Sequence, residues 1–127
     1  MVPMSDGPPV APVPSDAPLP PLSLRTYVEG DATVVACTGK LTAGLTSILR
    51  DEVKALIPQN KKIILDLTGL TQMDSMGLGT IVALYVSAKT SGTTIILINL
   101  SPRIRDLFRI TNVWSVLEVY GKNIIRM

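Results

Sequence analysis

"LDLTGLTQMDSMGLGTIVALYV", residues 65–86, is the stretch that decides the fold. An apolar, strand-like run ends in a polar turn, and Gly77 and Gly79 then open an apolar run with helical spacing. A buried strand that leads into the N-terminus of a helix is typical of α/β proteins, which place cofactors, phosphates and nucleophiles at such junctions. The chemistry of this junction depends on Asp74 and Ser75, which stand between the two runs.

The flanking sequence continues this alternation of strands and helices. Strands are predicted over residues 23–29, 32–41, 61–67 and 94–100, the first two forming a hairpin through a turn at Gly30. Helices are predicted over 42–57, over 75–90 and from Pro102 onward. Ser101 is expected to cap the last helix and Asn112 to end it. Residues 116–120 are expected to form either an edge strand or a further helical turn. Continuous apolar strands between amphipathic helices indicate an α/β fold. We expect a mostly parallel mixed sheet of four to five strands with an N-terminal hairpin, covered by three to four helices.

The N-terminal segment differs in composition from the rest. Residues 1–22 contain eight of the ten prolines and two acids, and all twelve Lys and Arg residues follow them. Proline removes a backbone donor and disfavours helix in the residue before it, so we expect a disordered tail over 1–22 and one folded domain over 23–127. The N-terminus does not resemble a signal peptide and the apolar runs are too short to span a bilayer, so we expect a cytoplasmic protein with no membrane insertion.

Composition argues against several classes of function. The chain has no histidine and a single cysteine, Cys37, so the commonest general base and the commonest metal ligands are missing. We expect no metal site and no cofactor, and we interpret Cys37 as a buried apolar side chain within a strand. The basic residues are scattered and lack interleaved aromatic residues, which argues against nucleic-acid binding.

Three chemical interpretations of the junction are weak. Gly77-Leu78-Gly79 begins a dinucleotide fingerprint, but Val82 stands at the third glycine position, and the Lys of a phosphate-binding P-loop is absent. A nucleophilic Ser75 would need a glycine at Met73 and a histidine elsewhere, so we expect no enzyme. The simplest role is a helix cap at Asp74 or Ser75, yet a cap does not explain two glycines in the first turn. Small residues there leave the helix start accessible to another protein.

The same residues resemble the signature of the STAS domain, the anti-sigma factor antagonist family. Its signature places an apolar-Asp-apolar strand before Asp-Ser-Ser/Ala-Gly-Leu-Gly, which matches Asp66 and the loop residues Asp74, Ser75, Gly77, Leu78 and Gly79. The runs "VVACTGKLT" and "INLSPRIRDLFRITNVWSVLEVY" are similar to the family's second strand and to its last strand, third helix and end. The resemblance covers essentially all of residues 23–121.

The resemblance implies a partner switch. The unmodified protein would bind an anti-sigma factor that is itself a serine kinase, the kinase would phosphorylate Ser75, and a PP2C-type phosphatase would reverse the modification. Phosphorylation adds about −1.5 to −2 charges at pH 7. A helix N-terminus tolerates an anion, whereas Asp74 would repel it and no basic residue lies within several positions of Ser75 in the chain. We therefore expect the modification to act on the interface rather than on the core. We expect a monomer or weak dimer.

The chain departs from the family pattern in three places, one of which is the Pro-rich tail, an extension beyond the family's minimal domain. Lys40 and Thr42 stand where the family usually carries acids after the second strand, and Met76 replaces a small residue beside the phosphoacceptor. We expect these three residues and the loop Asp74–Gly79 to contact the partner. The alternative is a STAS subunit of a larger scaffold or transport complex, in which Ser75 is only a helix cap.

Overall fold

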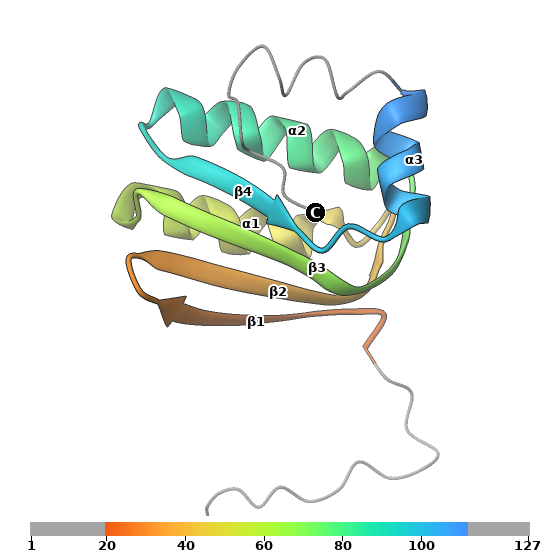
Figure 1. Cartoon of the computed structure of the whole chain (residues 1–127), viewed down its shortest axis with the longest axis horizontal. Helices are drawn as coiled ribbons and strands as arrows, with labels where there is room; N and C mark the ends of the chain where they lie inside the picture. The colour runs from red at the N-terminus through yellow and green to blue at the C-terminus, as the bar shows by residue number, and fades with distance from the viewer. Residues whose placement is uncertain (1–19, 112–127) are drawn as a thin grey trace, which may run out of the picture.

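A computed structural model describes residues 20–111 as one mixed sheet with helices packed against it (Figure 1). The sheet order is β1-β2-β3-β4, with β1 antiparallel to β2 and the other pairs parallel. The elements are β1 (Leu22–Glu29), β2 (Ala32–Leu41), α1 (Thr46–Leu56), the 3-10 turn η1 (Ile57–Gln59), β3 (Lys62–Met73), α2 (Ser75–Thr90), β4 (Thr94–Ile98) and α3 (Pro102–Ile110). The predicted α/β class, hairpin and mostly parallel sheet are confirmed. The tail over 1–19, Asn112 and the segment 116–120 lie outside the described residues.

The core lies between the sheet and the helices. Val35, Leu65 and Leu97 pair across β2, β3 and β4 and are all buried in the core cluster. From the helices, Leu49, Ile81 and other apolar side chains complete this core; the cluster also contains Val53, Leu78, Leu84, Tyr85, Ala88, Ile104 and Phe108. Burying such side chains supplies most of the favourable free energy of folding.

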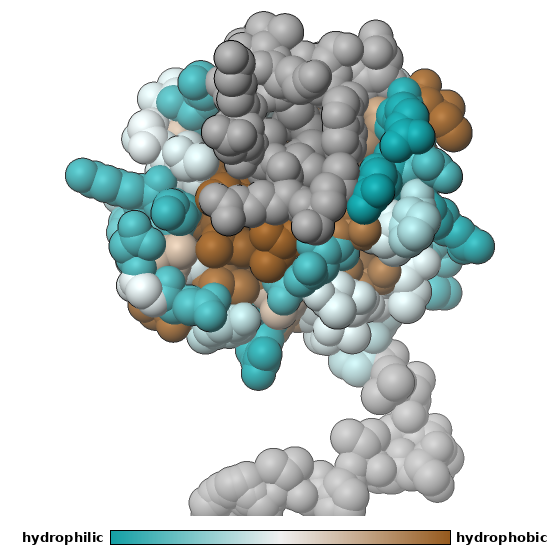
Figure 2. Space-filling view, in the orientation of Figure 1, coloured by the Kyte–Doolittle hydropathy of each residue, from teal (hydrophilic) through white to brown (hydrophobic). Residues whose placement is uncertain are grey.

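The opposite face of the sheet is also apolar near its centre. Side chains alternate across a strand, so the row of Val34, Ile64 and Ile96 faces away from the core row. Val34 and Ile96 are buried, although neither belongs to the core cluster. Figure 2 shows apolar residues gathered near the centre of one face, framed by hydrophilic ones.

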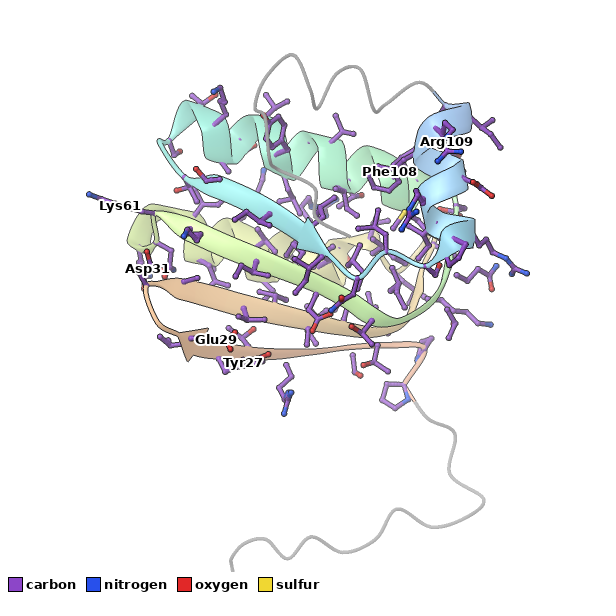
Figure 3. All side chains as sticks on the ribbon, viewed as in Figure 1. Tyr27, Glu29, Asp31, Lys61, Phe108 and Arg109 are labelled. Carbon is purple, nitrogen blue, oxygen red and sulfur yellow. The ribbon has the colours of Figure 1, made fainter. Side chains whose placement is uncertain are left out.

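Helix α3 begins as predicted. The hydroxyl oxygen of Ser101 accepts a hydrogen bond from the backbone N–H of Ile104 at 3.3 Å, and Pro102 occupies the first turn, where its missing N–H is not needed. The Phe108 side chain is fully buried, while Arg109 points outward from the same helix (Figure 3).

Strand β3 is longer than predicted. The segment 68–73, expected to be a polar turn, continues the strand to Met73 and pairs with the second half of β2. The register shifts twice along this pairing, between Ala36 and Thr38 and between Gly39 and Lys40. Such irregularities change which residues face inward, so the apolar alternation that would reveal the strand is interrupted. Leu67 and Leu70 are both buried although they stand three residues apart.

Helix α1 begins four residues later than predicted, at Thr46 instead of Thr42. Gly44 has a φ of +88°, a left-handed conformation that interrupts a right-handed helix. Residues 42–45, here called the β2–α1 turn, are closed by a hydrogen bond from the N–H of Leu45 to the carbonyl of Thr42 at 2.9 Å. Strand β1 likewise begins one residue before its predicted start, because Leu22 is buried and pairs with Gly39.

The parallel strands place three connections at one end of the molecule. The carboxyl ends of β2, β3 and β4 point the same way, so the β2–α1 turn, the start of α2 and helix α3 lie at one edge of the sheet (Figure 1). In open parallel sheets this edge is where binding sites form. Within residues 20–111, no helix combines the length and the apolar character that crossing a membrane requires.

Candidate functional site

Asp74 joins two segments that are distant in the sequence. One carboxylate oxygen accepts a hydrogen bond from the N–H of Gly77 at 3.0 Å and so caps α2. The other accepts from the N–H of Ala43 in the β2–α1 turn at 2.9 Å. The N–H groups of Ala43 and then Gly77 hold the pKa of Asp74 below its ordinary value of 3.8. The predicted cap is therefore Asp74, and its carboxylate also fixes the turn beside the helix start.

Gly77 permits a close approach between α2 and the end of β2. A Cβ atom at this position would lie 2.1 Å from the carbonyl oxygen of Leu41 and 3.0 Å from its Cγ. No side chain fits at that separation. Gly79 differs, because a Cβ built there meets nothing within 4 Å. The two glycines therefore have different roles. Gly77 is needed for close packing against β2, whereas Gly79 leaves the surface of α2 open.

Ser75 is the first residue of α2 and is exposed. Met76 follows it with 59% of its surface exposed and so places a flexible apolar side chain beside Ser75. Because Asp74 caps α2, the Ser75 hydroxyl does not serve as the helix cap. The arrangement can present a hydroxyl and an apolar side chain together at a helix N-terminus.

The other predicted contact residues divide into two groups. Lys40, near the end of β2, is exposed, and Thr42, just after that strand, is half-buried. Both are close in the chain to Ala43, whose N–H donates a hydrogen bond to Asp74. Leu78 and Gly77 are buried, so they support the surface from below instead of forming it. The structure thus brings Lys40 and Thr42 to the same edge of the sheet as the helix start.

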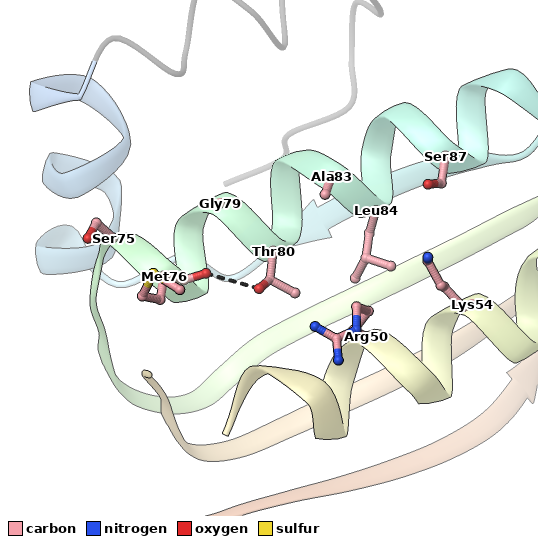
Figure 4. Close-up of a pocket in the computed structure, with 9 residues that line it drawn as sticks. All are labelled: Arg50, Lys54, Ser75, Met76, Gly79, Thr80, Ala83, Leu84 and Ser87. Atoms are coloured by element: carbon pink, nitrogen blue, oxygen red, sulfur yellow. Dashed lines mark hydrogen bonds between the residues drawn. The ribbon is translucent and has the colours of Figure 1, made fainter. Parts of the chain in front are cut away.

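Two basic residues that sequence reasoning did not connect with the junction line a cavity whose other wall includes Ser75. A cavity of about 270 Å³ between α1 and α2 is lined by Arg50 and Lys54 from α1 and by α2 residues that include Ser75 (Figure 4). Figure 4 draws Ser75 at the N-terminal end of α2, whereas Lys54 lies toward Ser87, further along that helix. Arg50 and Lys54 are four residues apart, a spacing that predicts one helix face, but only tertiary packing sets that face against α2.

Asp66, the other acid that matches the family signature, lies elsewhere. Its Oδ1 accepts hydrogen bonds from the N–H of Thr68 at 3.0 Å, the hydroxyl of Thr68 at 2.6 Å and the side-chain amide of Asn99 at 3.0 Å. Partial burial opposes ionisation, but these hydrogen bonds prevail and lower the pKa of Asp66. Asn99 has a φ of +62°, so this contact holds the strained connection between β4 and α3.

The described residues offer no donor set for a metal. No group of three or more His, Cys, Asp or Glu side chains is placed to hold an ion within residues 20–111. Cys37 is buried at 1% exposure, and desolvation raises the pKa of its thiol to about 12. It is a core residue, as its sequence context indicated.

Comparison with known proteins gives a family match over most of the chain. The family model described as "STAS domain" matches residues 23–122. The anti-sigma-B factor antagonist of Bacillus subtilis (strain 168) is 29% identical over 89 residues, which cover 70% of this chain and 82% of that protein.

Solved structures that share the fold include an anti-sigma factor antagonist and part of a membrane transporter. The Bacillus cell fate determinant SpoIIAA in the phosphorylated form aligns with a TM-score of 0.59 and 22% identity, covering 73% of this chain and 86% of that one. The murine Solute Carrier 26 family member A9 anion transporter in the inward-facing state aligns with a TM-score of 0.66 and 19% identity. That alignment covers 78% of this chain but only 16% of the transporter.

Proposed function

The chain belongs to the STAS domain family, and from this premise we propose that it is an anti-sigma factor antagonist controlled by phosphorylation of Ser75. The observation that carries the proposal is the placement of Ser75. Its hydroxyl is exposed at the first position of α2, next to an Asp74 carboxylate that is already occupied by two backbone N–H groups. The relative in Bacillus subtilis named an anti-sigma-B factor antagonist supports the general role.

In this proposal the unmodified protein binds an anti-sigma factor that is a serine kinase. The exposed surface of Ser75, Met76 and Gly79, with Lys40 and Thr42 beside it, forms the contact. The kinase transfers a phosphoryl group to Ser75 and releases the protein, and a PP2C-type phosphatase restores the binding form. The switch operates in the cytoplasm, where sigma factors act.

The fold is suited to survive this modification. Ser75 is exposed, so a phosphoryl group on it displaces no core side chain. The free N–H groups at a helix start and the helix dipole favour a nearby anion by about 0.3–1 kcal/mol. The effect therefore falls on the partner, because a new charge facing a desolvated contact is costly for binding.

The experiment is intact-mass spectrometry after incubation with ATP and the anti-sigma kinase encoded nearest this gene. We expect one addition of about 80 Da, the mass of a phosphoryl group, in the wild type. The addition should be absent in Ser75→Ala and retained in the matched control Ser87→Ala, which alters another serine of the same cavity. An unchanged mass in the wild type, or phosphorylation that persists in Ser75→Ala, would contradict the proposal.

A second candidate function keeps the fold but changes the role. The likeness to one segment of a membrane transporter indicates that this fold also occurs as a part of larger proteins. The chain would then be a subunit of a scaffold or transport complex, and Ser75 would have no switching role. Co-purification with sister STAS proteins or membrane proteins, without a kinase, would favour this alternative.

A further inference from the structure

The outer edge of β1 has no partner strand within residues 20–111. The sheet order places β1 at one end of the sheet, where it pairs with β2 alone (Figure 1). That pairing is continuous over the eight residues of β1, from Leu22 opposite Gly39 to Glu29 opposite Ala32. Every second residue of an edge strand turns its backbone N–H and C=O away from the sheet, where they can bind another strand. Strand β1 contains neither a proline nor a bulge that would prevent such pairing.

Two large apolar side chains are exposed on this edge strand. Tyr27 is 37% exposed and Val28 is 75% exposed. The hydroxyl of Thr26 donates to Glu52 of α1 at 2.8 Å, so Thr26 faces the helices, and Val28, two residues further along, shares that face. Tyr27 therefore lies on the other face of the sheet. An edge strand that exposes apolar side chains on both faces favours association with another strand.

The charged side chains of β1 are spaced so that they complement a second copy of the strand. Arg25 and Glu29 lie two residues before and two residues after Tyr27, and all three share one face. When β1 pairs antiparallel with its own copy and Tyr27 lies opposite the partner's Tyr27, each Arg25 lies opposite the partner's Glu29. The same register sets Val28 beside the partner's Thr26 and so covers it. None of the three ion pairs found in residues 20–111 involves Arg25 or Glu29.

We propose that β1 is a self-complementary edge through which two copies of this chain form a symmetric dimer. The dimer has one continuous sheet, to which each copy contributes its four strands. The two-fold axis passes beside Tyr27, and the Arg25 guanidinium already lies 5.0 Å from the centre of that ring. The contact is closed, because both copies use the same edge and leave none for a third. Two exposed ion pairs contribute little each, so the association is weak and falls with added salt.

The dimer contact lies away from the Ser75 site. Strand β1 runs antiparallel to β2, so Glu29 lies at the end of the sheet opposite to the one where α2 begins. Figure 3 shows Tyr27 and Glu29 on β1, with Arg109 of α3 at the other end of the molecule. Both copies of the Ser75 surface therefore stay open to a partner, at opposite ends of the continuous sheet. The dimer does not depend on the proposed function of Ser75.

The first test exchanges the two charges and measures the dissociation constant of the dimer by sedimentation equilibrium of the full chain at low salt. Arg25→Glu and Glu29→Arg each set like charges opposite one another in both pairs, so each should weaken the dimer at least about tenfold. The double variant with both substitutions restores opposite charges, and its dissociation constant should return to within about threefold of the wild-type value. Lys61→Glu, which makes the same change of charge outside β1, is the control. Circular dichroism checks that every variant is folded.

A cysteine at the two-fold axis tests the register. Residues that lie opposite one another in an antiparallel pair have Cα atoms about 4.5–5.5 Å apart, a separation that a disulfide can bridge. Tyr27→Cys should therefore give a covalent dimer on air oxidation with copper phenanthroline. Ser23→Cys lies on the same face of β1 but should not, because its two copies would be roughly 26 Å apart along the strands. Cys37 is buried, so the native thiol does not compete.

Four outcomes would overturn the inference. A wild type that stays monomeric up to about 1 mM would remove the dimer. Single charge variants that dimerise as well as the wild type would place the contact elsewhere. A double variant as weak as the single ones would refute the pairing of Arg25 with Glu29, and equal cross-linking of Ser23→Cys and Tyr27→Cys would refute the register. Each of these outcomes leaves phosphorylation of Ser75 unaffected, so the dimer and the proposed function fail separately.

Discussion

Replacing Gly77 by alanine tests the close packing on which the site depends. The added Cβ would lie 2.1 Å from the carbonyl oxygen of Leu41 and 3.0 Å from its carbonyl carbon, both backbone atoms that cannot rotate away. Overpacking of a buried position costs about 1–3 kcal/mol. Alanine regains up to about 1 kcal/mol over glycine through its helix propensity. The free energy of unfolding should therefore fall by about 1–2 kcal/mol, which lowers the thermal midpoint by roughly 5–10 °C.

Gly79→Ala is the matched control for this prediction. It adds the same methyl group two residues along the same helix, where a Cβ meets nothing within 4 Å. Here the higher helix propensity of alanine is not opposed by a clash, so the free energy of unfolding should rise by up to about 1 kcal/mol. Urea unfolding followed by circular dichroism measures both variants. If Gly77→Ala were as stable as Gly79→Ala, the contact between α2 and the end of β2 would be refuted.

Three further predictions concern single side chains. Asp74→Ala removes the hydrogen bonds to Ala43 and Gly77. The pKa of Asp74 is lowered on folding, so the stability that its carboxylate contributes is complete above the ordinary value of 3.8 and is lost as the pH falls through the lower folded value. The urea midpoints of the variant and the wild type should therefore differ at neutral pH and converge in acid. The thiol of Cys37, buried with a pKa of about 12, should react with Ellman's reagent only after unfolding in denaturant, and rapid labelling of the native protein would contradict its burial. Thr93→Val removes a buried hydroxyl that donates to the carbonyl oxygen of Ile57 at 3.0 Å. Because that oxygen loses this donor, calorimetry should find that the free energy of unfolding falls by about 1–2 kcal/mol. An unchanged thermal midpoint would mean that the hydroxyl is dispensable.

The sequence predicts the order and type of the described elements because strong apolar periodicity specifies each of them. It also predicts the cap at Ser101 and the helix start near Asp74, where short polar side chains have a defined local role. The second half of β3 could not be predicted in this way. Its pairing depends on β2, and the register shifts there break the period that identifies a strand. The late start of α1 at Thr46 depends on Gly44 and on a hydrogen bond from Ala43 to a residue thirty-one positions away.

The candidate site shows the same division. Ser75, Asp74 and Met76 were found from the local motif, and the structure places them together at the surface of one helix start. The cations Arg50 and Lys54 carry no local signal that connects them with Ser75. Their position is decided by how α1 packs beside α2, which is a tertiary property. Sequence reasoning therefore identified Ser75 as the proposed phosphoacceptor, whereas the two cations of the α1–α2 cavity could be found only from the fold.

The central claim is that phosphorylation of Ser75 changes the affinity for the kinase, and calorimetry on both forms of the wild-type protein tests it most directly. The protein is first phosphorylated to completion by the kinase, repurified, and titrated beside the unmodified form. The account predicts tight binding of the unmodified protein and a loss of about 10²-fold to 10⁴-fold after phosphorylation, the upper value being what a near-complete switch requires. Equal affinities of the two forms would contradict it.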